Sequence, residues 1–221
     1  MMSNVEHAVK SRLVRVPVGE VSLEGDLTIP AGARGIVMFA HGSGSGRHSP
    51  RNRLVAESLN ARGLATLLLD LLTEEEEVID ERTRHLRFDI PMLAQRLAFA
   101  ADWLAEHPEG VDLALGLFGA STGAGAALIV AAQRPKLVCA VVSRGGRPDL
   151  AGEALPQVEC PTLLIVGGWD APVIELNKEA MAHMRGLVKL TVVPGATHLF
   201  EEAGKLEAVA KLAGDWFERY L

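Results

Sequence analysis

The sequence has little cysteine, no excess of positive charge and no long apolar segment. Its 221 residues include only two cysteines, Cys139 and Cys160. The first lies inside an apolar run and the second precedes a proline, a pattern that favours reduced thiols over a disulfide framework. Acidic residues outnumber Lys and Arg by 28 to 22, for a net charge of −6, which provides no positive field for a nucleic acid backbone. The apolar runs are too short to span a bilayer, so we expect neither nucleic acid nor membrane partners.

The first residues also lack the features of a targeting segment. Residues 1–13 contain no long apolar stretch and no small-residue cleavage site, so the sequence predicts no signal peptide and no lipid anchor. Cytoplasmic residence is therefore expected. With 48% hydrophobic and 23% charged residues, the chain has the composition of a globular protein, and its length favours one domain over residues 1–221.

Short apolar runs without alternation recur along most of the chain, which is typical of parallel strands buried on both faces. These runs are 35–40, 65–70, 113–119, 137–143, 162–168 and 188–194. Segments with helical spacing separate them, which indicates parallel strand-helix-strand crossovers. Two alternating runs near the start, 13–18 and 21–29, predict an antiparallel hairpin. The sequence thus predicts an α/β fold with a mostly parallel central sheet, helices on both faces and an N-terminal antiparallel hairpin.

Ser121 stands at the centre of the pentapeptide Gly-Ala-Ser-Thr-Gly, between the run 113–119 and an Ala-rich helical segment, 124–132. Small residues around a serine at a strand-to-helix turn are typical of a nucleophile elbow, in which the hydroxyl points away from the strand. The same pentapeptide also occurs where a strand and a helix merely pack closely. The assignment therefore depends on a base and an acid at the same edge of the sheet.

Seven histidines compete for the role of base. His198 is favoured because it lies between the last predicted strand and the last helix, at the carboxyl edge of the sheet. Asp170 follows the preceding strand, and an acid there can orient the imidazole. The order Ser, Asp, His on successive strand ends is that of α/β-hydrolases, so we predict Ser121 as nucleophile, His198 as base and Asp170 as acid. Glu201 and Glu202 are alternative acids, although residues at a helix start are better explained by the helix dipole.

A glycine-rich segment, 41–52, follows the first run of the parallel sheet. Its glycines allow the backbone to approach a ligand closely. The N–H of Ser43, or failing that of Gly44, is predicted to form an oxyanion hole together with the N–H of Thr122. The segment lacks the lysine of a P-loop and the spacing of a dinucleotide fingerprint, so we expect no cofactor, and we expect no metal site.

Together these motifs resemble the dienelactone hydrolase-like branch of the α/β-hydrolase superfamily, over nearly the whole chain. The segments with this resemblance are 41–52, 119–123, 143–152, 163–170 and 194–202. The resemblance implies an α/β-hydrolase fold and hydrolase activity. Dienelactone hydrolases proper use a cysteine nucleophile, whereas this sequence has Ser121, so dienelactone is not the expected substrate. Similar sequences also form the hydrolase half of longer chains that have a phosphoribosyltransferase domain.

Several side chains near the predicted site are candidate substrate contacts. Gly44 and Arg47 lie in the glycine-rich segment, Arg144 follows a predicted strand, and Trp169 is a bulky neighbour of the predicted acid that the family pattern does not lead one to expect. Guanidinium groups suit a substrate with a carboxylate. Salt bridges to the acidic stretch 74–81 are a slightly better explanation of the arginines. Weaker candidates of the same group are His48, Arg51, His85 and Arg147.

The strongly charged segment 73–88 interrupts the rhythm of strands and helices. Blocks of like charge resist burial, so we expect a solvated excursion over the carboxyl edge of the sheet. A lid that gates access of the substrate is the alternative.

The predicted function is hydrolysis of a small ester, thioester or lactone through an acyl-enzyme on Ser121. The expected partner is therefore a small-molecule acyl substrate. Acyl transfer or perhydrolysis by the same residues is one alternative, and a non-catalytic binding module with a hydrolase-like fold is another. The sequence defines no oligomeric state.

Overall fold

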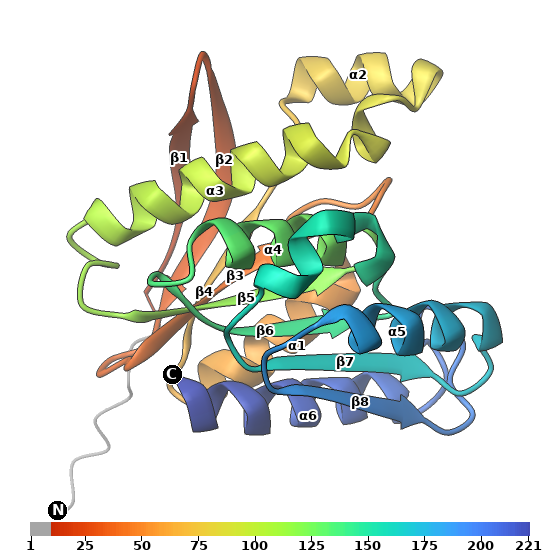
Figure 1. Cartoon of the computed structure of the whole chain (residues 1–221). Coiled ribbons are helices and arrows are strands. Elements are labelled where there is room, and N and C mark those ends of the chain that lie inside the picture. The colour runs from red at the N-terminus through yellow and green to blue at the C-terminus, as the bar shows by residue number, and fades with distance from the viewer. Residues whose placement is uncertain (1–9) are drawn as a thin grey trace, which may run out of the picture.

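The computed structural model describes residues 10–221, in which eight strands form one sheet with helices on both faces (Figure 1). The strand order is β1-β2-β4-β3-β5-β6-β7-β8. β1 (Lys10–Val18) pairs antiparallel with β2 (Val21–Ile29), and β2 pairs antiparallel with β4 (Ala65–Leu69). All other pairs are parallel, and their further strands are β3 (Gly35–Ala40), β5 (Ala114–Ala120), β6 (Val138–Arg144), β7 (Thr162–Gly167) and β8 (Val188–Val193). The predicted mostly parallel sheet with an antiparallel N-terminal hairpin is confirmed.

The hairpin forms because its apolar residues alternate and a glycine allows the turn. Val14, Val16 and Val18 of β1 are buried, whereas the residues between them face away from the core. Gly19 has a φ of +65°, a left-handed conformation that glycine adopts without strain and that suits a two-residue hairpin loop. β1 begins three residues before the start that the sequence predicts.

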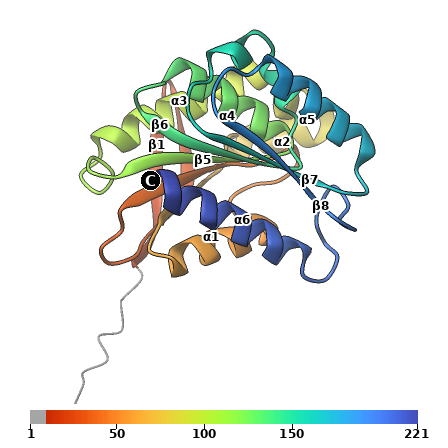
Figure 2. The ribbon, with the colours of Figure 1, turned by 60° about the horizontal axis from the view of Figure 1, so that its bottom comes forward.

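The central strands are buried because helices cover both faces. Every residue of β3, β4 and β7 is buried. One face packs against α1 (Pro50–Ala61) and α6 (Lys205–Tyr220), and the other against α3 (Ile90–Glu106), α4 (Thr122–Gln133) and α5 (Ala171–His183), as Figure 2 shows. Successive residues of β3 contribute to opposite cores: Met38 packs on the α3 and α4 side, and Phe39 on the α1 and α6 side. This layering leaves the carboxyl ends of the parallel strands at one common edge.

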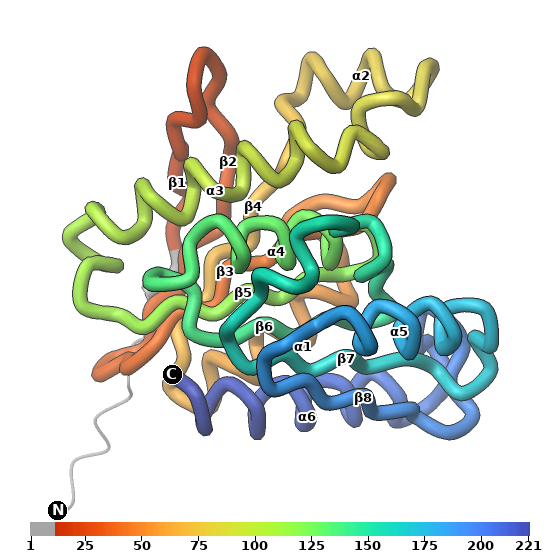
Figure 3. Tube along the Cα trace, in the orientation of Figure 1, coloured from red at the N-terminus to blue at the C-terminus, as the bar shows by residue number. Residues whose placement is uncertain are grey.

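The charged segment 73–88 contains a helix that the sequence analysis does not predict. α2 spans Glu74–Thr83, and a short 3₁₀ turn, η1, spans Leu86–Phe88. Thr73 and Glu76 form a reciprocal capping box, with the Thr73 N–H donating to Glu76 Oε2 at 2.9 Å. The Thr-x-x-Glu pattern is the signal that identifies this helix start. The helix is mostly exposed, as an excursion would be, and lies on the same side of the molecule as the tip of the hairpin (Figure 3).

Within residues 10–221, no helix is both long enough and apolar enough to cross a membrane.

Candidate active site

Ser121 occupies a strained turn between β5 and α4. Its φ and ψ are 49° and −122°, a conformation that costs a side-chain-bearing residue about 1–3 kcal/mol. Glycines permit the turn: a Cβ on Gly119 would lie 2.4 Å from Ala124 Cα, and a Cβ on Gly123 would lie 2.2 Å from the carbonyl oxygen of Ala40. The turn therefore has the geometry of the predicted nucleophile elbow.

The structure brings the imidazole of His198 between Ser121 and Asp170. His198 Nδ1 lies 2.7 Å from Asp170 Oδ2, and His198 Nε2 lies 3.4 Å from Ser121 Oγ. Asp170 is the residue before α5, yet its side chain makes no capping hydrogen bond there. Its carboxylate is thus directed to the imidazole rather than to the helix. An Nδ1–H donated to the carboxylate leaves Nε2 free to accept the serine proton.

The loops that present the acid and the base are joined to each other. The Trp169 N–H donates to the Ala196 carbonyl at 2.9 Å, which fixes the loop of Asp170 against the loop of His198. Phe200, two residues after the histidine, has a φ of 59° and is completely buried. Its ring therefore anchors the histidine loop in the α1 and α6 core.

The two alternative acids have other partners. Glu202 accepts the N–H of Thr197 at 3.1 Å, and hydrogen bonding to Thr197, chiefly through the threonine side chain, lowers the pKa of Glu202. Glu201 pairs with Arg51 at 2.8 Å. Asp170 is the acid whose carboxylate meets the imidazole.

The predicted oxyanion donors lie together beside the nucleophile. A Cβ on Gly42 would lie 2.9 Å from Ser121 Cβ, so the loop of residues 42–47, here called the glycine loop, packs directly on the nucleophile. The Ser43 N–H donates to Thr122 Oγ1 at 3.0 Å. A substrate oxyanion would compete with this hydroxyl for the Ser43 N–H. Gly44, the fallback donor, is exposed and has a φ of +70°.

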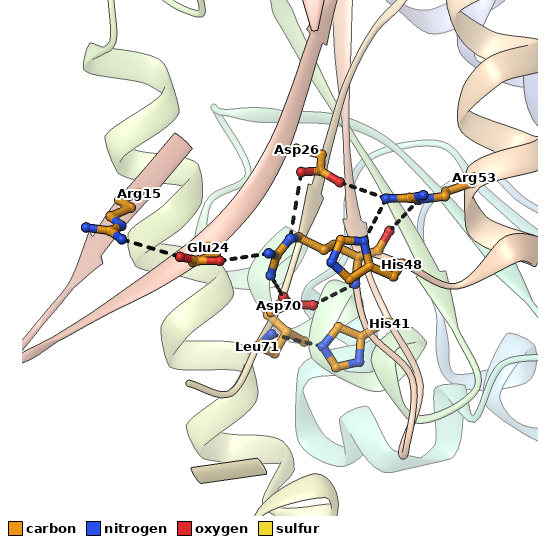
Figure 4. Close-up of polar contacts among 9 residues, drawn as sticks. Arg15, Glu24, Asp26, His41, His48, Arg53, Asp70 and Leu71 are labelled. Atoms are coloured by element: carbon orange, nitrogen blue, oxygen red, sulfur yellow. Dashed lines mark hydrogen bonds and ion pairs between the residues drawn. The ribbon is translucent and has the colours of Figure 1, made fainter. Parts of the chain in front are cut away.

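Arg47 is held by carboxylates of the protein. Its guanidinium pairs with Asp70, with Glu24 at 2.7 Å and with Asp26 at 3.7 Å, and Figure 4 shows these three carboxylates converging. The predicted partners in the stretch 74–81 are wrong for this arginine. The reason is that β2 and β4 are neighbours in the sheet and present their carboxylates at the point where the glycine loop passes.

Two further arginines also have partners outside the stretch 74–81. Arg51 pairs with Glu201 across the site, and Arg147 forms a two-bond pair with Asp149 at 2.8 and 2.7 Å. These arginines thus form salt bridges, as expected, but the predicted acidic partners are wrong, and substrate contact by the arginines stays a prediction.

Arg144 has no carboxylate partner among residues 10–221. The side chain is buried on the α1 side of the sheet, its Nη2 donates to Asn52 Oδ1 at 3.2 Å, and its Nε has no hydrogen-bond partner. Burial, and secondly the nearby Arg51, lower the pKa of Arg144 to about 10. The guanidinium therefore remains charged at neutral pH. Its role as a substrate contact stays a prediction.

Trp169 is 69% exposed, and its ring lies near Gly195. Two other candidates are exposed as well: His48 Nδ1 accepts from Arg53 at 2.7 Å, and His85 Nδ1 lies 2.7 Å from Thr83 Oγ1. Substrate contact by these residues also stays a prediction.

An open cleft of about 1190 Å³ borders the glycine loop from Gly42 to Arg47, and Ser121, His198 and Asp170 are not among the residues that line it. The hairpin and α2 form its other walls, and most of its lining side chains are charged or polar. The charged residues that line it are Arg15, Glu24, Arg47, Arg51, Asp70, Glu74, Glu75, Glu77, Asp80, Glu81 and Arg87. Within residues 10–221, no group of three or more His, Cys, Asp or Glu side chains is placed to hold a metal ion.

Sequence reasoning missed His41, which holds the start of the glycine loop. The side chain is buried; its Nε2 accepts the Leu71 N–H at 2.9 Å and its Nδ1 lies 3.0 Å from the Gly42 carbonyl oxygen. These contacts require a neutral ring with the proton on Nδ1. The His-Gly pair directly after a buried strand is the signal in the sequence, but the partner Leu71 is visible only in the fold.

The buried His41 ring is expected to make stability depend on pH. Burial lowers its pKa below the usual value of 6.5, so the unfolded chain takes up the proton first as the pH falls. Stability from the neutral ring is complete above pH 6.5 and is lost as the pH falls toward the folded pKa, by up to about 1.4 kcal/mol per pH unit. Urea unfolding between about pH 5 and 7.5 should show the advantage of wild type over His41→Gln shrinking on acidification. A constant difference would contradict this.

Comparison with known proteins defines the class. Residues 23–221 match the dienelactone hydrolase family, and the chain therefore belongs to that family. A crystal structure of dienelactone hydrolase from Anabaena variabilis ATCC 29413 is 62% identical, with a TM-score of 0.96 over 97% of this chain and 100% of that chain. The predicted α/β-hydrolase fold is confirmed. The family assigns the chain to enzymes of the hydrolase type.

More distant and longer relatives complete the comparison. Est1E from Butyrivibrio proteoclasticus, at 15% identity, shares the fold with a TM-score of 0.78 over 94% of this chain and 98% of that chain. "Putative phosphoribosyl transferase Rv0571c" of Mycobacterium tuberculosis (strain ATCC 25618 / H37Rv) is 61% identical over 208 residues, which are 94% of this chain and 46% of that protein. This chain thus spans about half the length of the curated relatives it matches.

Proposed function

We propose that the protein is a serine hydrolase that cleaves small, polar esters, thioesters or lactones through an acyl-enzyme on Ser121. The observation that carries the proposal is the chain of contacts from Ser121 Oγ to His198 Nε2, at 3.4 Å, and from His198 Nδ1 to Asp170, at 2.7 Å. A nucleophile, a base within reach and an acid that orients the base are the elements of nucleophilic acyl transfer.

In the first half of the reaction, Ser121 Oγ attacks the substrate carbonyl carbon as His198 Nε2 accepts the hydroxyl proton. Asp170 holds the other ring nitrogen and stabilises the imidazolium that forms. The negative charge that develops on the carbonyl oxygen is bound by backbone N–H groups of the glycine loop and of Thr122. The imidazolium then donates its proton to the departing alcohol or thiol, which leaves the acyl group on Ser121.

In the second half, water takes the place of the leaving group. His198 removes a proton from the water as its oxygen attacks the acyl carbon, and the same N–H groups bind the second oxyanion. When the intermediate collapses, the imidazolium returns the proton to Ser121 Oγ. The products are a carboxylic acid and the regenerated serine.

The nature of the cleft supports a small, polar substrate. Among the residues that line it, Val21, Pro50, Leu72 and Leu93 are apolar, whereas the rest are charged, polar or glycine. An acyl chain that extends from Ser121 past Gly42 and Ser43 would enter this cleft, where few apolar side chains are available to bury it.

Esters with longer acyl chains are therefore expected to show no gain in kcat/KM. An apolar acyl pocket would contribute about 0.8 kcal/mol per buried methylene, or roughly a fourfold increase each. We expect p-nitrophenyl octanoate to be cleaved with a kcat/KM at or below that of the acetate. A steady rise along the series acetate, butyrate, hexanoate and octanoate would indicate an apolar pocket and contradict this substrate class.

Labelling with a fluorophosphonate probe tests the proposed function. The probe phosphonylates an activated serine, so mass spectrometry should find a single adduct on Ser121, accompanied by loss of ester hydrolysis. A folded protein that neither reacts with the probe nor cleaves activated esters would be a non-catalytic module with this fold. Acyl transfer and perhydrolysis use the same acyl-enzyme and are distinguished by adding an alcohol or peroxide as the competing acceptor.

The mycobacterial relatives are named as phosphoribosyl transferases, an activity that we do not propose for this chain. That name describes proteins about twice as long as this chain, which covers 46% of each. Cytoplasmic residence, a single domain and the absence of nucleic acid and membrane partners stay predictions of the sequence.

A further inference from the structure

The residues that follow β4 hold the glycine loop at both of its ends. At the far end, Asp70 Oδ1 accepts the Arg47 N–H at 2.6 Å, and Asp70 Oδ2 pairs with the Arg47 guanidinium. At the near end, the Leu71 N–H donates to His41 Nε2 at 2.9 Å (Figure 4). Two consecutive residues of one strand end thus fix the start and the finish of the loop.

The contact between Asp70 and the loop is close and largely shielded from solvent. A Cβ on Gly46 would lie 2.7 Å from Asp70 Oδ1, so the carboxylate lies directly against the loop backbone. The side chains of Asp70 and Arg47 are 14% and 17% exposed. Charge-assisted hydrogen bonds with so little solvent contact are stronger and more directional than surface ion pairs.

β2 fixes Arg47 and its surroundings from the other side. Glu24 binds the Arg47 guanidinium at 2.7 Å, and Asp26 pairs with Arg53 at 3.2 Å. Arg53 Nε in turn donates to the Arg47 carbonyl at 3.4 Å. Arg47 is therefore held from two sides. Asp70 is the residue that binds both the backbone N–H and the guanidinium of Arg47.

The position of this loop decides where its N–H groups point. Oxyanion donors act only when they lie about 2.7–3.1 Å from the developing charge. The loop contains three glycines, Gly42, Gly44 and Gly46, and a glycine-rich backbone has wide conformational freedom unless contacts restrict it. Ser43 lies between the two anchored ends. A shift of the loop at Arg47 would therefore move the Ser43 N–H away from Ser121.

We propose that Asp70 is a positioning residue for catalysis, which holds the glycine loop so that its N–H groups meet the oxyanion. The inference rests on the proposed serine hydrolase function. Asp70 acts through Arg47 and the loop backbone and touches no reacting atom. Its removal should weaken stabilisation of the transition state more than binding of the substrate.

Two variants and one matched control test the inference. Asp70→Leu removes both acceptor oxygens, whereas Asp70→Asn keeps one acceptor for the Arg47 N–H and loses the charge. Asp102→Asn is the control, because Asp102 on α3 forms a comparable two-bond pair with Arg134, at 2.8 and 2.8 Å, and lines no part of the cleft. Each purified protein is assayed for kcat and KM with p-nitrophenyl acetate, for Tm, and for its affinity for an aryl trifluoromethyl ketone, which forms a tetrahedral adduct with serine.

We expect kcat of Asp70→Leu to fall about 100-fold, the lower end of the effect of removing one oxyanion donor, and that of Asp70→Asn about tenfold. Affinity for the ketone should fall by the same factors while KM changes less than about threefold. If Asp70→Leu does not fold, the kinetics and ketone affinity of Asp70→Asn still test whether Asp70 positions the loop. Kinetics and ketone affinity equal to those of Asp102→Asn, with or without a lower Tm, would overturn the inference, and so would a raised KM at unchanged kcat. A wild type that does not bind the ketone would instead overturn the proposed function.

Discussion

Replacement of Ser121 by alanine is expected to abolish turnover of p-nitrophenyl acetate, with a loss in kcat on the order of 10⁴-fold or more. The change removes the attacking oxygen, which lies 3.4 Å from His198 Nε2, and leaves the rest of the site in place. Alanine suffers the same strain as serine at a φ of 49°, so the fold should not change. Release of p-nitrophenol by the purified variant measures its turnover, and circular dichroism and Tm measure whether the fold is intact.

The same variant should also lose labelling by the fluorophosphonate probe. Hydrolysis at the wild-type rate by pure, folded Ser121→Ala would place the nucleophile elsewhere and refute the acyl-enzyme on this residue. Residual activity at a small fraction of the wild-type rate would agree with the proposal, since binding and oxyanion stabilisation alone accelerate hydrolysis about 10³- to 10⁴-fold over water.

Asp170→Asn is expected to lower kcat by roughly 10⁴-fold. The carboxylate accepts the Nδ1 proton of His198 at 2.7 Å, which keeps Nε2 free to act as the base. An asparagine of the same size can donate its amide N–H to Nδ1 and thereby hold the opposite tautomer, with the proton on Nε2 facing Ser121. Steady-state kinetics on the folded variant measure the loss.

Glu201→Gln and Glu202→Gln are the matched controls for this prediction. Both remove one carboxylate near the base, but Glu201 pairs with Arg51 and Glu202 with the Thr197 N–H, so each should keep nearly full activity. If instead a glutamate variant were inactive and Asp170→Asn retained its activity, the acid would belong to the histidine loop. Equal, small losses in all three variants would indicate a Ser and His pair that acts without an acid.

Periodicity identified the fold because the strands of this chain are short, apolar and buried on both faces. The run 35–40 coincides with β3, and the run 113–119 lies one residue before β5 (Ala114–Ala120). Strand ends shifted by a residue because hydrogen bonding, rather than hydrophobicity, sets where a strand stops. The helix α2 escaped prediction because its charged sequence has no apolar face, and only its capping box marks it.

Chain order identified the three residues of the candidate site, since the carboxyl ends of all strands in a parallel sheet meet at one edge. Ser121, Asp170 and His198 follow β5, β7 and β8 and come within hydrogen-bond reach. The environment of the arginines was not predictable in this way. Which carboxylate meets Arg47 depends on the pairing of β2 with β4, and the burial of Arg144 depends on the packing of α1 beneath the sheet.

The proposed base follows an edge strand of the sheet. β8 lies at the edge of the sheet and pairs with β7 alone, whereas β5, before Ser121, pairs on both sides, with β3 and β6. Opening of an edge strand costs less free energy than unfolding of the core. Such a local opening would carry His198 away from a nucleophile that stays in place, so chemical competence would be lost before the fold itself is.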